Sequence, residues 1–216
     1  MNKTSKLSRT IRAFAAAMGL VMLGAVAAPV AGHAQGNASS AQAIANHFSS
    51  VRTMTGEFVQ FGPSGEQTGG KFYIERPGKV RFDYEAPSNV QVISDGTSLV
   101  VQNRKLQTAD VYPLGKTPLK LLLDRQIDLS GSKVQSVKQD DELTTIKLAD
   151  KSVFGDSTIT MMFDSKSYEL RQWTITDAQG KDTTVMIFNV QNGVAFDPST
   201  FAIDYRKVNQ MNRKRN

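Results

Sequence analysis

The chain has 216 residues, with 26 Lys or Arg and 20 Asp or Glu, so its formal net charge is +6. Its hydrophobic content of 40% is typical of a globular protein and argues against a disordered chain. The absence of Cys excludes disulfides, thiolate metal sites and cysteine nucleophiles, and only two His are present.

Residues 1–34 have the pattern of a cleaved secretory signal peptide. Four basic residues and no acidic ones precede an uncharged apolar stretch from Ala13 to Val30, and Gly32-His33-Ala34 offers a small-residue cleavage site. An uncleaved membrane anchor is the alternative. An exported chain without Cys fits the oxidising bacterial periplasm, where we expect the protein to reside.

The basic charge is concentrated at the two ends of the chain. Without the four basic residues of the signal the net charge is +2, and residues 206–216 hold five further basic residues and no acidic one. Residues 35–205 therefore have a net charge of −3 and form one expected domain, followed by a basic C-terminal tail that we expect to be disordered. This distribution argues against a nucleic-acid-binding face.

The mature chain begins with a predicted helix and continues mainly as strands. Ser39 or Ser40 can cap a helix that runs to about Arg52, with an apolar stripe at Ala41, Ile44, Phe48 and Val51. Runs with a period of two, separated by turn residues, then predict about eleven antiparallel strands: 57–61, 70–75, 80–84, 90–94, 98–102, 105–111, 134–139, 144–148, 157–163, 170–176 and 183–190. The pattern indicates a mainly β protein built on a large curled sheet or barrel.

One short helix is expected between the two groups of strands. Pro118 is suited to the first position of a helix, and Thr117 can cap it. Leu119, Leu122 and Leu123 then form a compact apolar stripe, and the helix is expected to end at Asp124.

Several strands have one apolar face. In residues 70–76, Phe72 and Ile74 share a face with Arg76. In the next strand, Val80, Phe82 and Tyr84 share one face with each other. Further along, Trp173 alternates with polar residues. Such alternation fits a curled sheet with an apolar concave side, although a plain core covered by helices would give the same pattern.

The sequence offers little catalytic chemistry. No nucleophile elbow, phosphate-binding loop or metal-ligand motif is present. His47, the only His after the expected cleavage site, has no visible partner, and Asp140-Asp141-Glu142 is interpreted as a solvated turn. We therefore expect a binding protein with no catalytic residue, metal or cofactor.

From Phe58-Val59-Gln60 onward, the order of motifs resembles the LolA family of periplasmic carriers of outer-membrane lipoproteins. The similarity continues through Gly69-Gly70-Lys71-Phe72-Tyr73-Ile74-Glu75-Arg76-Pro77-Gly78-Lys79-Val80-Arg81-Phe82-Asp83-Tyr84, Pro87, Ser94-Asp95-Gly96, Thr117-Pro118-Leu119 and the segment from Asn192-Gly193 to Phe201. The Arg-Pro-Gly turn before an aromatic strand is the most specific of these motifs.

The resemblance implies an incomplete antiparallel β-barrel whose apolar concavity is covered by short helices. Arg76 would hold the lid helix, with Leu119, Leu122 and Leu123, closed in the empty protein. The lipid-binding cavity would be lined by Phe58, Phe72, Ile74, Val80, Phe82, Tyr84 and Trp173. The cargo would be an acylated lipoprotein, received from an inner-membrane lipoprotein-releasing ABC transporter and passed on by a monomeric carrier.

This chain departs from the family pattern at its C-terminus. The Pro/Gly-containing extension of well-known members is replaced by the basic tail, so an outer-membrane lipoprotein receptor remains only a possible partner. Two other functions fit the same fold: a carrier of another lipid, and a lipid- or lipoprotein-sensing regulator of envelope stress.

Overall fold

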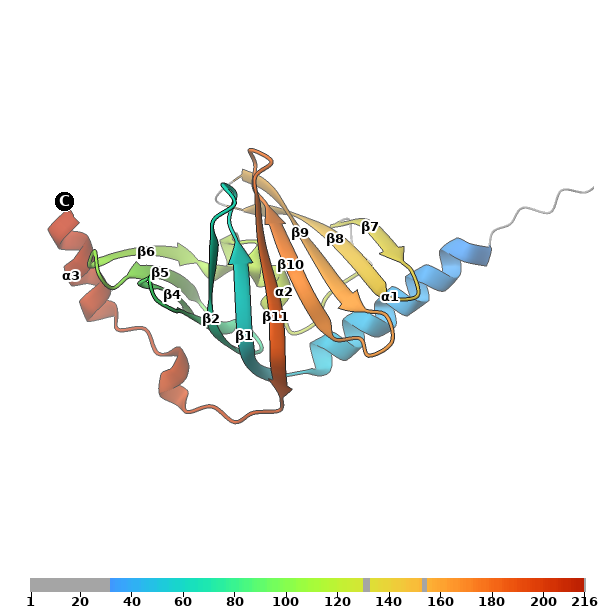
Figure 1. Cartoon of the computed structure of the whole chain (residues 1–216), viewed down its shortest axis with the longest axis horizontal. Coiled ribbons are helices and arrows are strands. Elements are labelled where there is room, and N and C mark those ends of the chain that lie inside the picture. Colours follow the sequence, from blue (N-terminus) through green and yellow to red (C-terminus); the bar gives the residue numbers. More distant parts are fainter. Residues whose placement is uncertain (1–31, 130–132, 153–154, 216) are drawn as a thin grey trace, which may run out of the picture. The chain divides into compact units, whose positions relative to one another are not determined.

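The first and last strands of the chain pair at the centre of one antiparallel sheet (Figure 1). The computed structural model describes residues 32–129, 133–152 and 155–215. Its eleven strands are β1 (Thr53–Phe61), β2 (Gln67–Glu75), β3 (Lys79–Tyr84), β4 (Val90–Asp95), β5 (Ser98–Asn103), β6 (Thr108–Pro113), β7 (Val134–Gln139), β8 (Leu143–Ser152), β9 (Gly155–Asp164), β10 (Leu170–Thr176) and β11 (Asp182–Asn192). All eleven expected strands are confirmed, with ends shifted by a few residues.

The sheet is curled but not closed into a barrel. Its strand order is β6-β5-β4-β3-β2-β1-β11-β10-β9-β8-β7, so β6 and β7 are the two edges. The described chain that follows β6 contains the 3-10 helix η1 (Leu114–Lys116) and the short helix α2 (Leu119–Leu123). The expected incomplete barrel with short covering helices is therefore confirmed.

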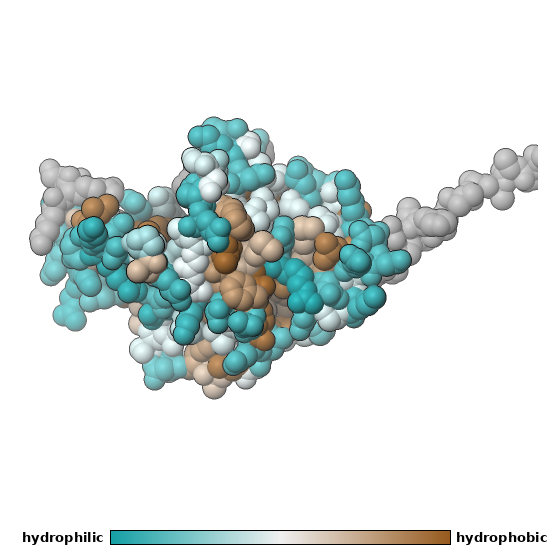
Figure 2. Space-filling view, viewed as in Figure 1, coloured by the Kyte–Doolittle hydropathy of each residue, from teal (hydrophilic) through white to brown (hydrophobic). Residues whose placement is uncertain are grey.

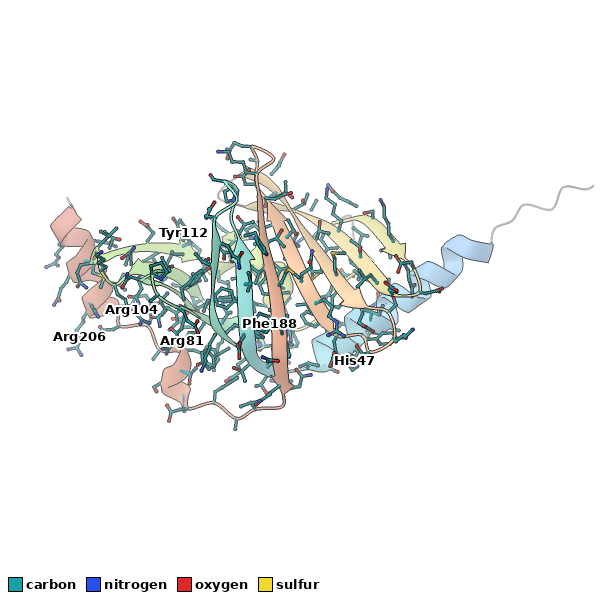
Figure 3. All side chains as sticks on the ribbon, viewed as in Figure 1. His47, Arg81, Arg104, Tyr112, Phe188 and Arg206 are labelled. Carbon is teal, nitrogen blue, oxygen red and sulfur yellow. The ribbon has the colours of Figure 1, made fainter. Side chains whose placement is uncertain are left out.

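The two faces of the sheet differ in polarity and burial. In β11, Val185 and Ile187 are buried with 6% and 7% exposure, whereas Met186 and Phe188 between them are 44% and 41% exposed. Phe58 of β1 pairs with Ile187, which places both on the inner face. The apolar patch over β1 and β11 in Figure 2 lies on the opposite, outer face, where Figure 3 labels Phe188. The inner face is therefore the one that holds the main core.

The N-terminal helix α1 (Gly32–Ser50) covers part of that inner face and packs near β7. Ala41, Ile44 and Phe48 of the expected stripe are buried, and the Phe48 ring lies edge-on against Phe163 of β9 at 5.3 Å. The helix begins at Gly32, so the expected cleavage site after Ala34 falls in its first turn. Residues 1–31, with the rest of the expected signal peptide, lie outside the described residues. None of the described helices is both long and apolar enough to cross a membrane.

The C-terminal segment differs from the expectation of disorder. Residues 198–201 form the 3-10 helix η2 (Pro198–Phe201), and Tyr205–Arg215 forms helix α3. Val208 and Met211, three residues apart, are buried against the outer face of β4–β6. This apolar pair fixes a segment whose basic composition alone suggested a free tail.

Two turns that carry the sequence motifs pack against each other. Gly78, between β2 and β3, and Gly96, between β4 and β5, both have a positive φ of 79° and 101°. A Cβ added at Gly78 would lie 2.9 Å from the Gly96 Cα atom. The Arg-Pro-Gly and Ser-Asp-Gly motifs therefore form one structural unit at the end of β2.

Gly70 offers a direct test of the register between β2 and β3. It pairs with Phe58 on one side and Tyr84 on the other, and the two rings meet with centroids 5.0 Å apart. A Cβ at Gly70 would lie 2.0 Å from the Asp83 carbonyl oxygen. Gly70→Ala should therefore lower the free energy of unfolding in urea by about 3 kcal/mol or more.

The matched control is Gly115→Ala, because a Cβ at Gly115 meets no atom within 4 Å. Its unfolding free energy should stay within about 0.5 kcal/mol of the wild type. Equal stability of the Gly70→Ala protein and the wild type would contradict the assigned strand pairing.

Candidate functional site

A cavity of about 300 Å³ lies on the inner face of the sheet, between the β3–β6 strands and β10–β11. Its walls are mainly aliphatic and aromatic, as in pockets for apolar ligands. The lining residues are Gln60, Phe82, Tyr84, Val92, Leu99, Val101, Tyr112, Thr117, Pro118, Leu119, Ser157, Trp173, Ile175, Asp177, Thr183 and Val185.

The expected cavity residues fall into two groups. Phe82, Tyr84 and Trp173 line the cavity. The others are on the same face of the sheet but belong to the buried core beside the cavity: Phe58, Phe72, Ile74 and Val80. The two groups are in contact, since the Phe82 ring centroid lies 5.1 Å from that of Phe58 and 6.1 Å from that of Trp173.

A polar pair interrupts the apolar wall. The Tyr84 hydroxyl donates a hydrogen bond to Gln60 Oε1 at 2.6 Å. Burial raises the pKa of Tyr84 to about 12. The phenol is therefore neutral at physiological pH and adds no charge to the cavity.

Residues 117–123 form the expected lid, and the first three of them border the cavity. Leu119 and Pro118 line the cavity, whereas Leu122 and Leu123 are buried in the core. The expected side-chain cap from Thr117 is not formed, because its hydroxyl donates back to the Leu114 carbonyl at 2.9 Å. The lid is therefore held mainly by its leucines and by contacts from outside the helix.

Arg76, directly after β2, joins the end of that strand to the lid through its side chain. Its side chain donates from Nε to the Leu122 carbonyl at 3.3 Å and from Nη1 to the Val51 carbonyl at 2.5 Å. Its guanidinium carbon lies 4.0 Å from the centre of the Phe48 ring, a cation–π contact. One side chain thus joins β2, the lid and the end of α1.

The Arg76 guanidinium is only partly satisfied. Arg76 is 4% exposed, and its Nη2 has no hydrogen-bond partner. Within the described ranges, no carboxylate forms an ion pair with it. Burial lowers the pKa of Arg76 to about 10, so the group stays charged at neutral pH. A buried charge held by two carbonyls and a ring has less stabilisation than a fully paired one.

Backbone contacts support the same junction. The Gly78 amide donates to the Leu123 carbonyl at 2.9 Å, and the Arg76 amide donates to the Arg52 carbonyl at 2.7 Å. Beyond the lid, the Ile127 amide donates to Ser49 Oγ at 3.0 Å. The lid and the end of α1 are therefore attached to the same end of β2 and to each other.

The other polar residues considered in the sequence do not form a site. His47 is exposed, with its ring edge-on to Tyr168 at 5.9 Å. Asp140 Oδ1 accepts hydrogen bonds from the amides of Glu142 and Leu143, as in a solvated turn. Nowhere among the described residues do His, Asp and Glu gather in a group that could hold a metal ion.

Sequence reasoning missed the cavity wall formed by β4–β6 and the partners of Arg76. Val92, Leu99 and Val101 could have been found by extending the register from Phe82, since each residue opposite an inward residue also points inward. The contacts of Phe48 and Val51 with Arg76 could not be predicted from the local sequence, because they depend on where α1 lies.

The sequence is similar to those of known lipoprotein carrier proteins. The sequence profile described as "Outer membrane lipoprotein carrier protein LolA" matches residues 49–204. An outer-membrane lipoprotein carrier protein of Methylococcus capsulatus is 27% identical over 161 residues, covering 70% of this chain and 77% of that one. One from Chromobacterium violaceum is 28% identical over 186 residues, covering 82% and 88%.

A solved LolA superfamily protein from Nitrosomonas europaea shares 12% identity and superposes with a TM-score of 0.40, covering 76% of this chain and 98% of that one. The profile match covers well over half of the sequence. The chain belongs to the LolA family of outer-membrane lipoprotein carrier proteins.

Filling the cavity should remove its capacity for an apolar ligand without unfolding the sheet. Ile175 of β10 is half-buried and lines the cavity, so Ile175→Trp would place a larger ring in that space. Binding of a fluorescent acyl probe, excited outside the tryptophan band, should weaken by at least about tenfold, which is the effect of 1.4 kcal/mol of lost apolar burial.

Gln172→Trp is the matched control, because Gln172 pairs with Met186 on the outer face of the same strand. It should bind the probe as the wild type does. If Ile175→Trp retains full binding and a native circular dichroism spectrum, the ligand occupies some other place.

Proposed function

We propose that the chain is a periplasmic, non-catalytic carrier that sequesters the acyl chains of lipoproteins released from the inner membrane and ferries them to the outer membrane. The observation that carries this proposal is an apolar cavity beside a lid held by the buried, incompletely satisfied Arg76. Membership of the lipoprotein carrier family supports the same cargo.

The cargo explains why such a site should open and close. Burying a 16-carbon acyl chain is worth roughly 12 kcal/mol at about 0.8 kcal/mol per methylene. Spontaneous release into water would therefore be very slow, and transfer has to occur through direct contact with a donor or an acceptor. We infer an inner-membrane ABC transporter as the donor, and the outer membrane as the destination, where a lipoprotein receptor is the acceptor only if this chain can dispense with the family's C-terminal extension.

The empty protein also needs a covered apolar surface. With the lid closed, Leu122 and Leu123 are almost fully buried and Leu119 is 8% exposed. A permanently open concavity would present a large apolar patch, which promotes association between molecules. The Arg76 contact with the Leu122 carbonyl is then the latch that keeps the empty state closed, and the bond to the Val51 carbonyl holds the guanidinium in place.

Arg76→Leu should separate loading from release. Leu removes the donor to the Leu122 carbonyl, which is the Arg76 bond that lid opening breaks, and so destabilises the closed empty state by about 1.5–3 kcal/mol. The loaded state loses little, so cargo should bind normally and pass to acceptor membranes at least about tenfold more slowly. Arg76→Lys should be intermediate, since one ammonium cannot reproduce the forked geometry of the guanidinium.

The measurement is the release rate of an acylated probe in the presence of acceptor vesicles. Arg171→Leu is the matched control, because Arg171 is exposed and binds only surface carboxylates. Release from folded Arg76→Leu as fast as from the wild type would remove Arg76 from the latch role. Native mass spectrometry of protein from the periplasm tests the cargo, since co-purification of free lipid alone would favour the carrier of another lipid.

A further inference from the structure

The outward side of α3 is basic. Arg206, Lys207 and Arg213 are exposed, whereas Val208 and Met211 are buried against Ile93, Val100 and Ala109 of the sheet. The helix contains no acidic residue. The buried pair therefore holds the helix so that its basic residues face away from the sheet.

The start of α3 is fixed by polar contacts as well. The Tyr205 hydroxyl donates to Asp95 Oδ2 at 2.8 Å, which ties the helix to the turn between β4 and β5. Asp204 Oδ1 accepts from the Lys207 amide at 3.1 Å and caps the first turn. The basic side is therefore presented by a fixed helix.

The β5–β6 turn, residues 104–107, presents an exposed leucine between polar residues. Leu106 is 68% exposed, the largest value among the exposed large hydrophobic residues, and it follows the basic pair Arg104 and Lys105. Asn103 Oδ1 accepts hydrogen bonds from the Lys105 and Leu106 amides, which fixes the turn. Part of the local charge is neutralised, since Arg104 pairs with Asp83 at 3.1 Å.

The turn and the helix belong to the same end of the sheet. Helix α3 packs on β6, and the tip of the β5–β6 hairpin lies beside it (Figure 1). Figure 3 shows Arg104 and Arg206 at this end, remote from His47. The remaining mature domain, residues 35–205, has a net charge of −3, whereas residues 206–216 hold five basic side chains in the sequence. The positive charge is thus local rather than a property of the whole surface.

We propose that α3 and the β5–β6 turn form a docking surface for an anionic phospholipid bilayer. Basic residues are attracted to the negative surface potential, and Leu106 can enter the interface while Arg104 and Lys105 stay at headgroup level. Charge complementarity together with a projecting leucine favours a lipid surface over a soluble polyanion, which would not require the leucine. This inference concerns the empty protein and does not rest on the proposed cargo.

The position of the surface has one consequence that does rest on the proposed function. Leu99 and Val101 of β5 and Tyr112 of β6 line the cavity. Docking through the hairpin would therefore bring the cavity wall to the membrane from which acyl chains leave or which they enter.

The test is co-sedimentation of the purified mature protein with vesicles of phosphatidylcholine, with or without phosphatidylglycerol, at low and high salt. The wild type should bind the anionic vesicles at low salt and dissociate at high salt. The triple variant Arg206→Gln, Lys207→Gln, Arg213→Gln should bind about 100-fold more weakly, at about fivefold for each basic residue. It should still bind an acyl probe in the cavity, which separates this inference from the proposed function.

The control is Lys138→Gln, Lys166→Gln, Lys181→Gln, which makes the same change in charge at three exposed positions in other strands and turns. It should keep wild-type binding. Leu106→Ser should weaken binding several-fold, and Leu106→Trp should show a blue-shifted emission on anionic vesicles. Equal binding to neutral and anionic vesicles, equal loss in the two triple variants, or binding to soluble heparin without binding to vesicles would overturn the proposal.

Discussion

One buried guanidinium connects helix α1 and the lid to the end of strand β2. The guanidinium of Arg76 is buried at the end of β2 and loses its hydration there. The Leu122 carbonyl, the Val51 carbonyl and the Phe48 ring replace part of that hydration. The unpartnered Nη2 means that this replacement is incomplete. Opening the lid would lose the bond to Leu122 but would return the guanidinium to water. The closed and open states can therefore lie close in free energy, as a ligand-driven change of population requires.

The sheet forms the other walls of the cavity and leaves one side open. Pairing of β1 with β11 joins two meanders into one curled surface, and the unpaired edges β6 and β7 leave it open. In a closed barrel of this size, the volume of the interior would be set by the strands alone. In the open sheet, a short leucine-rich helix can serve as a movable wall. The aromatic contacts among Phe58, Phe82 and Trp173 form a rigid region beside the cavity.

The strands and the burial of Arg76 could be predicted from local patterns. Turn residues such as Asp95-Gly96 fix strand ends, and the alternation of Phe72, Ile74 and Arg76 indicates that a charge faces the core. The location of the cavity along that face could not be predicted, because Phe72 and Phe82 have the same parity but only Phe82 lines it. That difference depends on where α1 and the lid lie. The order of α3 was missed because its basic composition concealed the apolar pair Val208 and Met211.

Amide hydrogen exchange of the lid in Arg76→Leu and the wild type measures the latch most directly. The Lys120 and Leu121 amides donate to the Thr117 and Pro118 carbonyls and report on the integrity of α2. If Arg76 holds the lid, exchange in residues 117–123 should accelerate by about tenfold or more in Arg76→Leu, as expected for the loss of a charged hydrogen bond. Exchange in β9 and β10 should stay unchanged. Unchanged lid exchange in a folded variant, or an equal acceleration throughout the sheet, would contradict the account.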